Sequence, residues 1–143
     1  MNSTGVHIPE SVSDVRDQYE EVGPLAQIVV REVAVAMGFD QEEYQRRVSE
    51  AVVATARDAL FAGRLTVHTG GYDVFQDWLD EPPQAAYELE LEGSENVDSV
   101  AWHPAPADER ILAATYQNEP QAAVATVRRL SWGRIYEPLL TEP

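Results

Sequence analysis

The order of apolar and polar residues predicts helices in the first half of the chain and strands in the second. Apolar residues recur at helical spacing after Ser11, whose side chain can cap a first helix. Gly23-Pro24 is expected to end this helix, and a second helix then runs to Gly38. We expect its buried face to consist of Leu25, Ile28, Val29, Val33, Ala36 and Met37. The valine content makes a strand the alternative, but the length and the two marked ends favour a helix.

The stretch from Phe39 to Gly63 carries the best-marked helix. Asp40 can accept hydrogen bonds from the first turn, and Gly63 can adopt the left-handed conformation that ends a helix. One apolar face comprises Tyr44, Val48, Ala51, Val52, Thr55, Ala59 and Ala62, and a second lies nearly opposite. A helix with two apolar faces is usually covered on both. We therefore expect it to pack against the preceding helix and against the sheet, with Val52 in the core.

After Gly63 the helical period gives way to alternation, which predicts strands. A short strand around residues 64–68 leads into Gly70-Gly71 and a short helix that begins near Tyr72. Residues 87–92 alternate three apolar residues with Glu88, Glu90 and Glu92, so the carboxylate face of this strand is expected to be wet.

Two further strands and a helix complete the pattern. A turn at Gly93–Asp98 is expected to lead back into a strand near residues 100–103. Residues 111–117 are apolar on both sides and should lie nearest the centre of the sheet. A last helix has Pro120 in its first turn and turns Ala123, Val124, Val127 and Leu130 toward the sheet.

These elements predict the α+β class, with an N-terminal three-helix segment, an antiparallel sheet of about four strands and a covering C-terminal helix. Residues 1–10 are expected to form a flexible arm and residues 11–143 a single domain.

The charge balance predicts a domain that is adapted to high salt. The chain has 25 acidic residues against 10 basic ones, a net charge of -15, and every basic residue is arginine. The carboxylates are dispersed, whereas a nucleic-acid mimic or a disordered tail would concentrate them. In molar salt the Debye length falls to about 3 Å, which screens this self-repulsion. We expect a halophile's protein that loses stability at low salt.

Composition also limits the location and the chemistry. The absence of cysteine excludes disulfides and thiolate metal sites. No basic leader and no run of roughly 18 apolar residues is present, so we expect a cytoplasmic protein without a membrane segment.

The histidines are the candidates for catalysis. His7, His68 and His103 lack the spacing of a metal site, and neither a metal nor another cofactor is expected. His68 and His103 each end a predicted strand beside an aromatic residue, so they can meet at one sheet edge near Glu88 or Asp73. A histidine paired with a carboxylate could then perform acid–base catalysis. The alternative for each histidine is a surface or hydrogen-bonded side chain.

The C-terminal part holds a local cluster of positive charge. Arg128, Arg129 and Arg134 are interleaved with Trp132 and Tyr136, a pattern that fits phosphate pairing and base stacking. The net charge of -15 argues against nucleic acid, and arginines near a helix C-terminus also offset the helix dipole. We favour the second interpretation.

Aromatic and leucine side chains supply the candidate interaction surface. Most aromatic residues are expected in the core. Exposed ones would mark a protein partner or a homo-oligomer, because large exposed apolar patches are rare on monomers. The candidates are Trp78, Trp132, Tyr136, Leu139 and Leu140.

The run QYEEVGPLAQIVVREVAVAMGFDQEEYQRRV, followed by ARDALFAG, resembles an uncharacterised family of small haloarchaeal proteins known only as a domain of unknown function. The resemblance implies a halophilic archaeal source and supplies no activity, ligand or site residue. The first hypothesis is a non-enzymatic protein-interaction or self-associating module. The alternative is a small enzyme or metabolite-binding protein that uses His68 and His103 with a nearby carboxylate.

Overall fold

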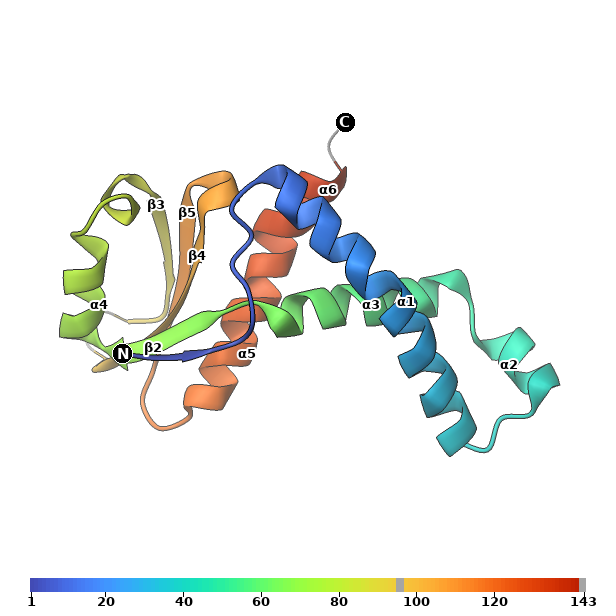
Figure 1. The fold of residues 1–143 in the computed structure, drawn as a ribbon. Helices are drawn as coiled ribbons and strands as arrows, with labels where there is room; N and C mark the ends of the chain where they lie inside the picture. The colour runs from blue at the N-terminus through green and yellow to red at the C-terminus, as the bar shows by residue number, and fades with distance from the viewer. Residues whose placement is uncertain (95–96, 142–143) are drawn as a thin grey trace.

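A sheet covered by helices lies in one half of the structure, a computed structural model that describes residues 1–94 and 97–141 (Figure 1). Its strands in the described residues are β1 (Asn2–Thr4), β2 (Val67–Gly71), β3 (Glu88–Glu92), β4 (Ser99–Ala105) and β5 (Arg110–Tyr116). They lie in the order β1-β2-β4-β5-β3, and all neighbours are antiparallel except β3 and β5. The α+β class is confirmed, but the sheet is mixed rather than antiparallel.

The position of β3 accounts for the mixed sheet. We expected β3 to turn back onto the next strand, but β4 is paired on both sides, by β2 and by β5. β3 therefore occupies the edge beside β5 and runs parallel to it. Residues 95 and 96 of the expected turn lie outside the described residues.

The helices are α1 (Val12–Ala36), α2 (Gln41–Arg47), α3 (Glu50–Arg64), α4 (Tyr72–Leu79), α5 (Pro120–Ser131) and α6 (Glu137–Thr141). A π-helical turn, Trp132–Tyr136, joins α5 to α6, and 3-10 turns cover Gln84–Ala86 and Pro106–Asp108. The segment 1–10, expected to be an arm, includes β1.

The first two expected helices are one helix, α1, and Pro24 lies inside it. The expected break at Gly23-Pro24 was therefore wrong. One face of α1 is buried over its whole length, through Val15, Val22, Ala26, Val30 and Ala34. Packing of a continuous face stabilises the helix through the proline, although a proline in a helix interior costs about 3 kcal/mol.

The expected third helix is divided into α2 and α3. Asp40 caps α2 as expected, because its carboxylate accepts a hydrogen bond of 2.8 Å from the N–H of Glu43. The backbone of Val48 is extended, and the hydroxyl of Ser49 accepts a hydrogen bond of 3.4 Å from the N–H of Val52. A serine at this position competes with helix continuation by capping a new helix. This second cap explains the division.

The covering helices also differ from the expectation. α5 packs on one face of the sheet, where Val124 and Val127 meet Val67, and α4 packs on the other, where Phe75 meets Trp102. α3 packs mainly on α1 and reaches the core only at its end. The expectation that the third helix covers the sheet was therefore wrong, and so was a buried Val52, which is 43% exposed.

The carboxylate face of β3 is wet only in part, because Glu88 and Glu92 are exposed and Glu90 is half-buried. Glu90 and Glu92 lie on the α5 side, where both bind the guanidinium of Arg134. Leu91 packs on the opposite side, in the cluster below α4. The alternation predicted for this strand is present, but both faces of the sheet are covered by a helix.

α1 and α3 form a helical hairpin that projects away from the sheet, with α2 at its far end (Figure 1). We use "free end" for residues 25–59, the part of the hairpin beyond Pro24. α2 has no buried residue, and α3 buries only Phe61, near the sheet. The free end is therefore held mainly by the packing of α1 on α3.

Candidate functional site

At the free end of the hairpin, the observed burial of side chains differs most from the burial that we expected from the sequence. The small residues Ala26 and Ala34 of α1 face inward, together with Val30. Larger apolar residues face the solvent instead, namely Leu25, Ile28, Val29, Val33, Val35 and Met37. Most of the stripe that we expected to be buried is therefore exposed, with 51% of Ile28 and 64% of Met37 accessible. Large exposed apolar patches are uncommon on monomeric soluble proteins.

This surface continues into a groove between α1 and α3. The groove has a volume of about 410 Å³, and α2 and the loop before it close one end. Its walls are almost wholly apolar and include Val29, Val33, Met37, Phe39, Val48 and Val52. Arg47 lies at the groove with its guanidinium carbon 5.4 Å from the centre of the Phe39 ring, a cation–π distance.

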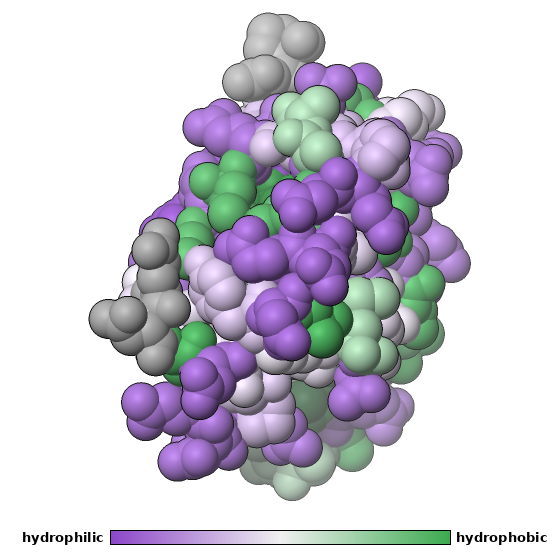
Figure 2. Space-filling model, turned by 90° about the vertical axis from the view of Figure 1, so that its left-hand side faces the viewer, coloured by the Kyte–Doolittle hydropathy of each residue, from purple (hydrophilic) through white to green (hydrophobic). Residues whose placement is uncertain are grey.

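On the opposite side of the molecule, exposed apolar residues are distributed differently. Figure 2 shows the side that carries α4, where hydrophobic residues are scattered among hydrophilic ones. Val74 and Leu89 are exposed there, each to 37%. Single exposed apolar residues are normal on a folded protein.

Two residues of the predicted interaction surface lie in the core between α1 and the sheet. Tyr136 is fully buried, and its ring contacts that of Phe61 at 5.4 Å between centres. Trp132 is half-buried and stacks on Tyr19 at 5.7 Å. Arg57 lies on Tyr19 as well, 4.1 Å from its ring centre. These residues attach the hairpin to the sheet domain.

The other predicted surface residues are half-buried. Trp78 of α4 lies against Trp102 of β4 and against Phe75 of its own helix, with ring centres 5.6 and 6.4 Å away. Leu139 and Leu140 pack on the core cluster between α1 and the sheet. The structure brings Leu139 and Leu140 together with Trp132, but Trp78 belongs to a different cluster.

The sheet separates the two candidate catalytic histidines. His68 pairs with Trp102 in the β2–β4 register and contacts Trp78 on the α4 side. His103 is the next residue of β4 and contacts Tyr136 on the α5 side. Because neighbouring residues of a strand point to opposite faces, the two imidazoles do not share a site.

His103 and Tyr136 form a buried polar pair. The Nδ1 atom of His103 lies 2.7 Å from the carbonyl oxygen of Thr66, which can only accept, so Nδ1 carries the hydrogen. Nε2 is then the acceptor for the Tyr136 hydroxyl, 2.5 Å away. Burial lowers the pKa of His103 to about 4 and raises the pKa of Tyr136. Both groups stay neutral over the physiological range, which suits a structural link and not proton exchange with solvent.

His68 is less buried than His103. Its Nδ1 atom forms a 2.7 Å hydrogen bond with the hydroxyl of Ser3 on β1, and burial lowers its pKa. Asp73 and Glu88, the carboxylates considered with it, are exposed, and no contact of either with His68 is found in the described residues. His7 is half-buried beside Phe61, with ring centres 6.0 Å apart.

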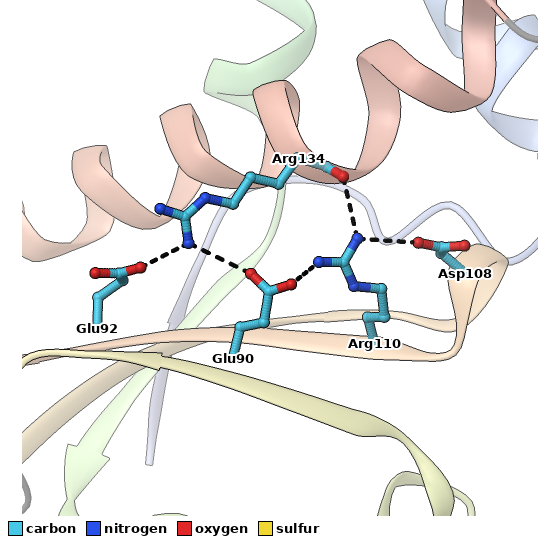
Figure 3. A network of polar contacts seen from close by, with 5 residues as sticks. All are labelled: Glu90, Glu92, Asp108, Arg110 and Arg134. Atoms are coloured by element: carbon cyan, nitrogen blue, oxygen red, sulfur yellow. Dashed lines mark hydrogen bonds and ion pairs between the residues drawn. The ribbon is translucent and has the colours of Figure 1, made fainter.

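Arg134 of the predicted positive cluster belongs to an ion-pair network with two strands (Figure 3). Its guanidinium binds Glu92 at 2.6 Å and Glu90 at 3.3 Å. Arg110 binds the other oxygen of Glu90, the carboxylate of Asp108 at 3.2 Å and the carbonyl of Arg134 at 3.0 Å. The network ties the edge strand β3 to β5 and to the π-helical turn.

Arg128 and Arg129 are the other two arginines of the predicted positive cluster. The Nε atom of Arg128 donates a 3.0 Å hydrogen bond to the carbonyl of Leu65, which joins α5 to the end of α3. Arg129 is exposed. Two of the three arginines thus bind groups of the same fold.

Cofactor and membrane sites were also sought. Among residues 1–94 and 97–141, no three histidine or acidic side chains lie close enough together to hold a metal ion. Within the same ranges, no helix combines the length and the apolar character that crossing a membrane requires.

The exposed residues of the free end are the ones that the sequence interpretation missed. The signal was present, because α1 is apolar on more than one side between Leu25 and Met37. A helix with this pattern is covered on both sides, and we assigned its larger residues to this chain's own core. A preference for the smaller residues at the close contact with α3 would have indicated the observed orientation.

Comparison with known proteins gives a family without an activity. The sequence model of a family of unknown function (DUF5809) matches residues 6–137. Neither the curated proteins nor the solved structures contain a match to the chain.

Proposed function

The chain belongs to this family of unknown function, and we propose that it is a protein-interaction module that acts through the apolar surface of the free end of its hairpin. The single observation that supports this proposal is the orientation of α1, which turns most of its larger apolar residues beyond Pro24 to solvent and Ala26 and Ala34 inward. Exposing them costs free energy in an isolated chain, about 25 cal/mol for each Å² of apolar surface. A bound partner would remove this cost.

We also propose that the protein works in a salt-rich cytoplasm. The support is the net charge of -15, carried without lysine. High salt strengthens effective apolar burial and screens repulsion between acidic proteins, so it favours contact through an apolar surface.

The alternative, a small enzyme with His68 and His103 at one centre, has less support. The two rings lie on opposite faces of the sheet. His103 is fully buried, and both of its ring nitrogens are hydrogen-bonded, one to Thr66 and one to Tyr136. General acid–base catalysis needs a group within hydrogen-bond reach of its substrate.

Site-specific photo-crosslinking in cells tests the interaction. We would replace Val35 with benzoylphenylalanine, because its side chain is 64% exposed at the free end. The matched control is the same replacement at Val74, an exposed valine of α4 on the other side of the molecule. We expect protein adducts from position 35 and none from position 74. Absence of adducts at both positions, or equal adducts at both, would overturn the proposal.

A further inference from the structure

One apolar face of α3 is left exposed by the rest of the chain. The sequence predicts two apolar faces for this helix, and Leu60, on one of them, packs on the core cluster between α1 and the sheet. The other face carries Val52, Thr55 and Ala59, and all three are exposed. A helix with two apolar faces is usually covered on both. The second face of α3 is therefore suited to a partner.

This exposed face is lined by two hollows that meet. The groove between α1 and α3 includes Val48, Val52 and Ala59. A second hollow of about 360 Å³ lies between α3 and α5, and its lining includes Ala59 again and Ala62. We use "α3 groove" for the two hollows together. From Val48 to Ala62 the axis of a helix rises about 21 Å, the length of roughly four helical turns.

The charges that line the α3 groove are mainly positive. Arg47 lies at one end, and Arg128 and Arg129 lie at the other. Asp58 is the acidic residue among the described lining residues, and its carboxylate already accepts a 2.7 Å hydrogen bond from the hydroxyl of Tyr19. Three arginines against one aspartate give this lining a net charge of +2, whereas the whole chain carries -15.

The three arginines lack carboxylate partners within residues 1–94 and 97–141. The guanidinium of Arg47 lies near the ring of Phe39, and only the Nε atom of Arg128 donates to the carbonyl of Leu65. The chain has 25 acidic side chains, yet none of those described pairs with these arginines. Carboxylates of a ligand would complete both ends of the groove.

We propose that the α3 groove binds one amphipathic helix of a partner protein, with an apolar face about four turns long and acidic residues at both ends of that face. The inference rests on the proposed function and names the chemistry of the partner. The apolar side chains of the partner lie against Val52 and Val33, as in other grooves that receive an amphipathic helix. Its carboxylates pair with Arg47 at one end and Arg129 at the other, which fixes the register.

Other anionic partners match this pattern of charge less well. The arginines are separated by the apolar length of α3, and the rest of the chain is strongly acidic. A membrane or a nucleic acid presents phosphates continuously, so it would also meet the carboxylates of this chain. A second copy would bring a further net charge of -15. A single helix can place its carboxylates at the two ends alone.

Two synthetic helices that differ only in their end charges test the acidic partner. Each has about 16 residues, a leucine face and a hydrocarbon staple on the far side, and the ends of the leucine face carry glutamate in one peptide and lysine in the other. Fluorescence anisotropy with the full chain in about 2 M KCl gives both Kd values, because this salt screens overall charge more than a contact ion pair. We expect the glutamate peptide to bind at least about tenfold more tightly. The net charge of -15 alone would favour the lysine peptide.

A bulky residue in the groove locates the binding. Ala59→Trp fills the point where the two hollows meet, and we expect it to weaken binding of the glutamate peptide by at least about tenfold. Ala54→Trp is the matched control, because Ala54 is an exposed alanine of the same helix outside the α3 groove. This control should bind the peptide as the parent does. The melting temperatures of both variants should stay close to that of the parent, since both alanines are exposed.

Charge reversal of the protein provides the complementary test. Arg47→Glu combined with Arg129→Glu should reverse the preference, so that the lysine peptide binds more tightly. Arg16→Glu combined with Arg31→Glu makes the same change in net charge on α1, outside the α3 groove. This control should keep the preference for the glutamate peptide.

The outcomes distinguish this inference from the proposed function. Equal binding of the two peptides, or tighter binding of the lysine peptide to the parent, would overturn the acidic helix, and an Ala59→Trp protein that binds as the parent does would overturn the groove. Dimers, or complexes with vesicles of anionic phospholipid, that Ala59→Trp abolishes would assign the groove to a second copy or to a lipid surface instead. Position 35 lies outside the α3 groove. Adducts from position 35 would then keep the interaction surface, whereas their absence would remove both proposals.

Discussion

At the scale of single residues, the structure assigns His103 a defined tautomer and a neutral state. The Thr66 carbonyl fixes the hydrogen on Nδ1, and the Tyr136 hydroxyl donates to Nε2. A protonated ring would lose the bond from Tyr136 as donor and would place a charge in the core. The pKa of His103 is therefore lowered, mainly by burial, to about 4.

This pKa predicts a loss of stability in mild acid. In the unfolded chain His103 binds a proton below pH about 6.5, whereas the folded chain resists protonation down to pH about 4. The contribution is complete above pH about 6.5 and is lost progressively as the pH falls to about 4, by about 3 kcal/mol in total. Urea unfolding at several pH values measures it.

A matched variant separates His103 from the carboxylates, which also lose stability in acid. For His103→Gln we expect a lower unfolding free energy at pH 7 and a difference from the parent that shrinks toward pH 4. A difference that stays constant with pH would show that His103 does not titrate as inferred. Tyr136→Phe should cost about 1–3 kcal/mol at pH 7, because Nε2 of His103 is left without a donor.

At the scale of elements, local capping was predictable from the sequence and the extent of the helices was not. Ser11 and Asp40 cap α1 and α2 as expected, since a cap depends on a hydrogen bond to a residue three positions later. Pro24 gives an equally local stop signal, but packing along α1 overrides it. Ser49 is a third cap whose signal we did not use.

The candidate site was less predictable than the fold class. Whether His68 and His103 face each other depends on the register between β2 and β4, which no pattern within either strand contains. The alternation at Leu89 and Leu91 correctly indicated a strand, but it did not indicate whether helices cover one face or both. The burial of Ala34 in place of Val33 depends on how closely α3 approaches α1.

Pro24 provides a prediction at this scale. Alanine at this position restores the N–H that a helix donates to the carbonyl of Glu20, and it removes the clash of the proline ring. We expect Pro24→Ala to raise the unfolding free energy by about 1–3 kcal/mol, measured by thermal or urea unfolding.

The matched control for this substitution is Pro120→Ala. Pro120 lies in the first turn of α5, where a missing N–H costs little, so the stability should hardly change. A Pro24→Ala protein less stable than the parent would mean that the proline stabilises mainly by restricting the unfolded chain.

At the scale of the whole molecule, net charge and not packing sets the dependence on salt. The acidic side chains are spread over the surface, and the ion-pair network of Arg110 and Arg134 neutralises only a few of them. Exposed ion pairs also contribute little, about 0–1 kcal/mol each. Self-repulsion of the folded chain is therefore controlled mainly by the ions in solution.

We expect the melting temperature to fall when KCl is lowered from about 2 M to about 20 mM, as the Debye length grows from a few Å to beyond 20 Å. A fall of more than about 5 °C would correspond to roughly 1 kcal/mol of lost stability for a domain of this size. Calorimetry at constant pH provides the measurement. An unchanged melting temperature would refute salt adaptation.

The projecting hairpin has a consequence for how the chain opens. α2 contributes nothing to the core, and the part of the hairpin that packs on the sheet domain, through the Tyr19 stack and Phe61, lies outside the free end. Its amides can exchange with solvent through a local opening that leaves the sheet folded, at a lower free energy than global unfolding. A partner on this surface closes that opening, so binding would slow amide exchange in α2 and in the first turns of α3, far from any strand.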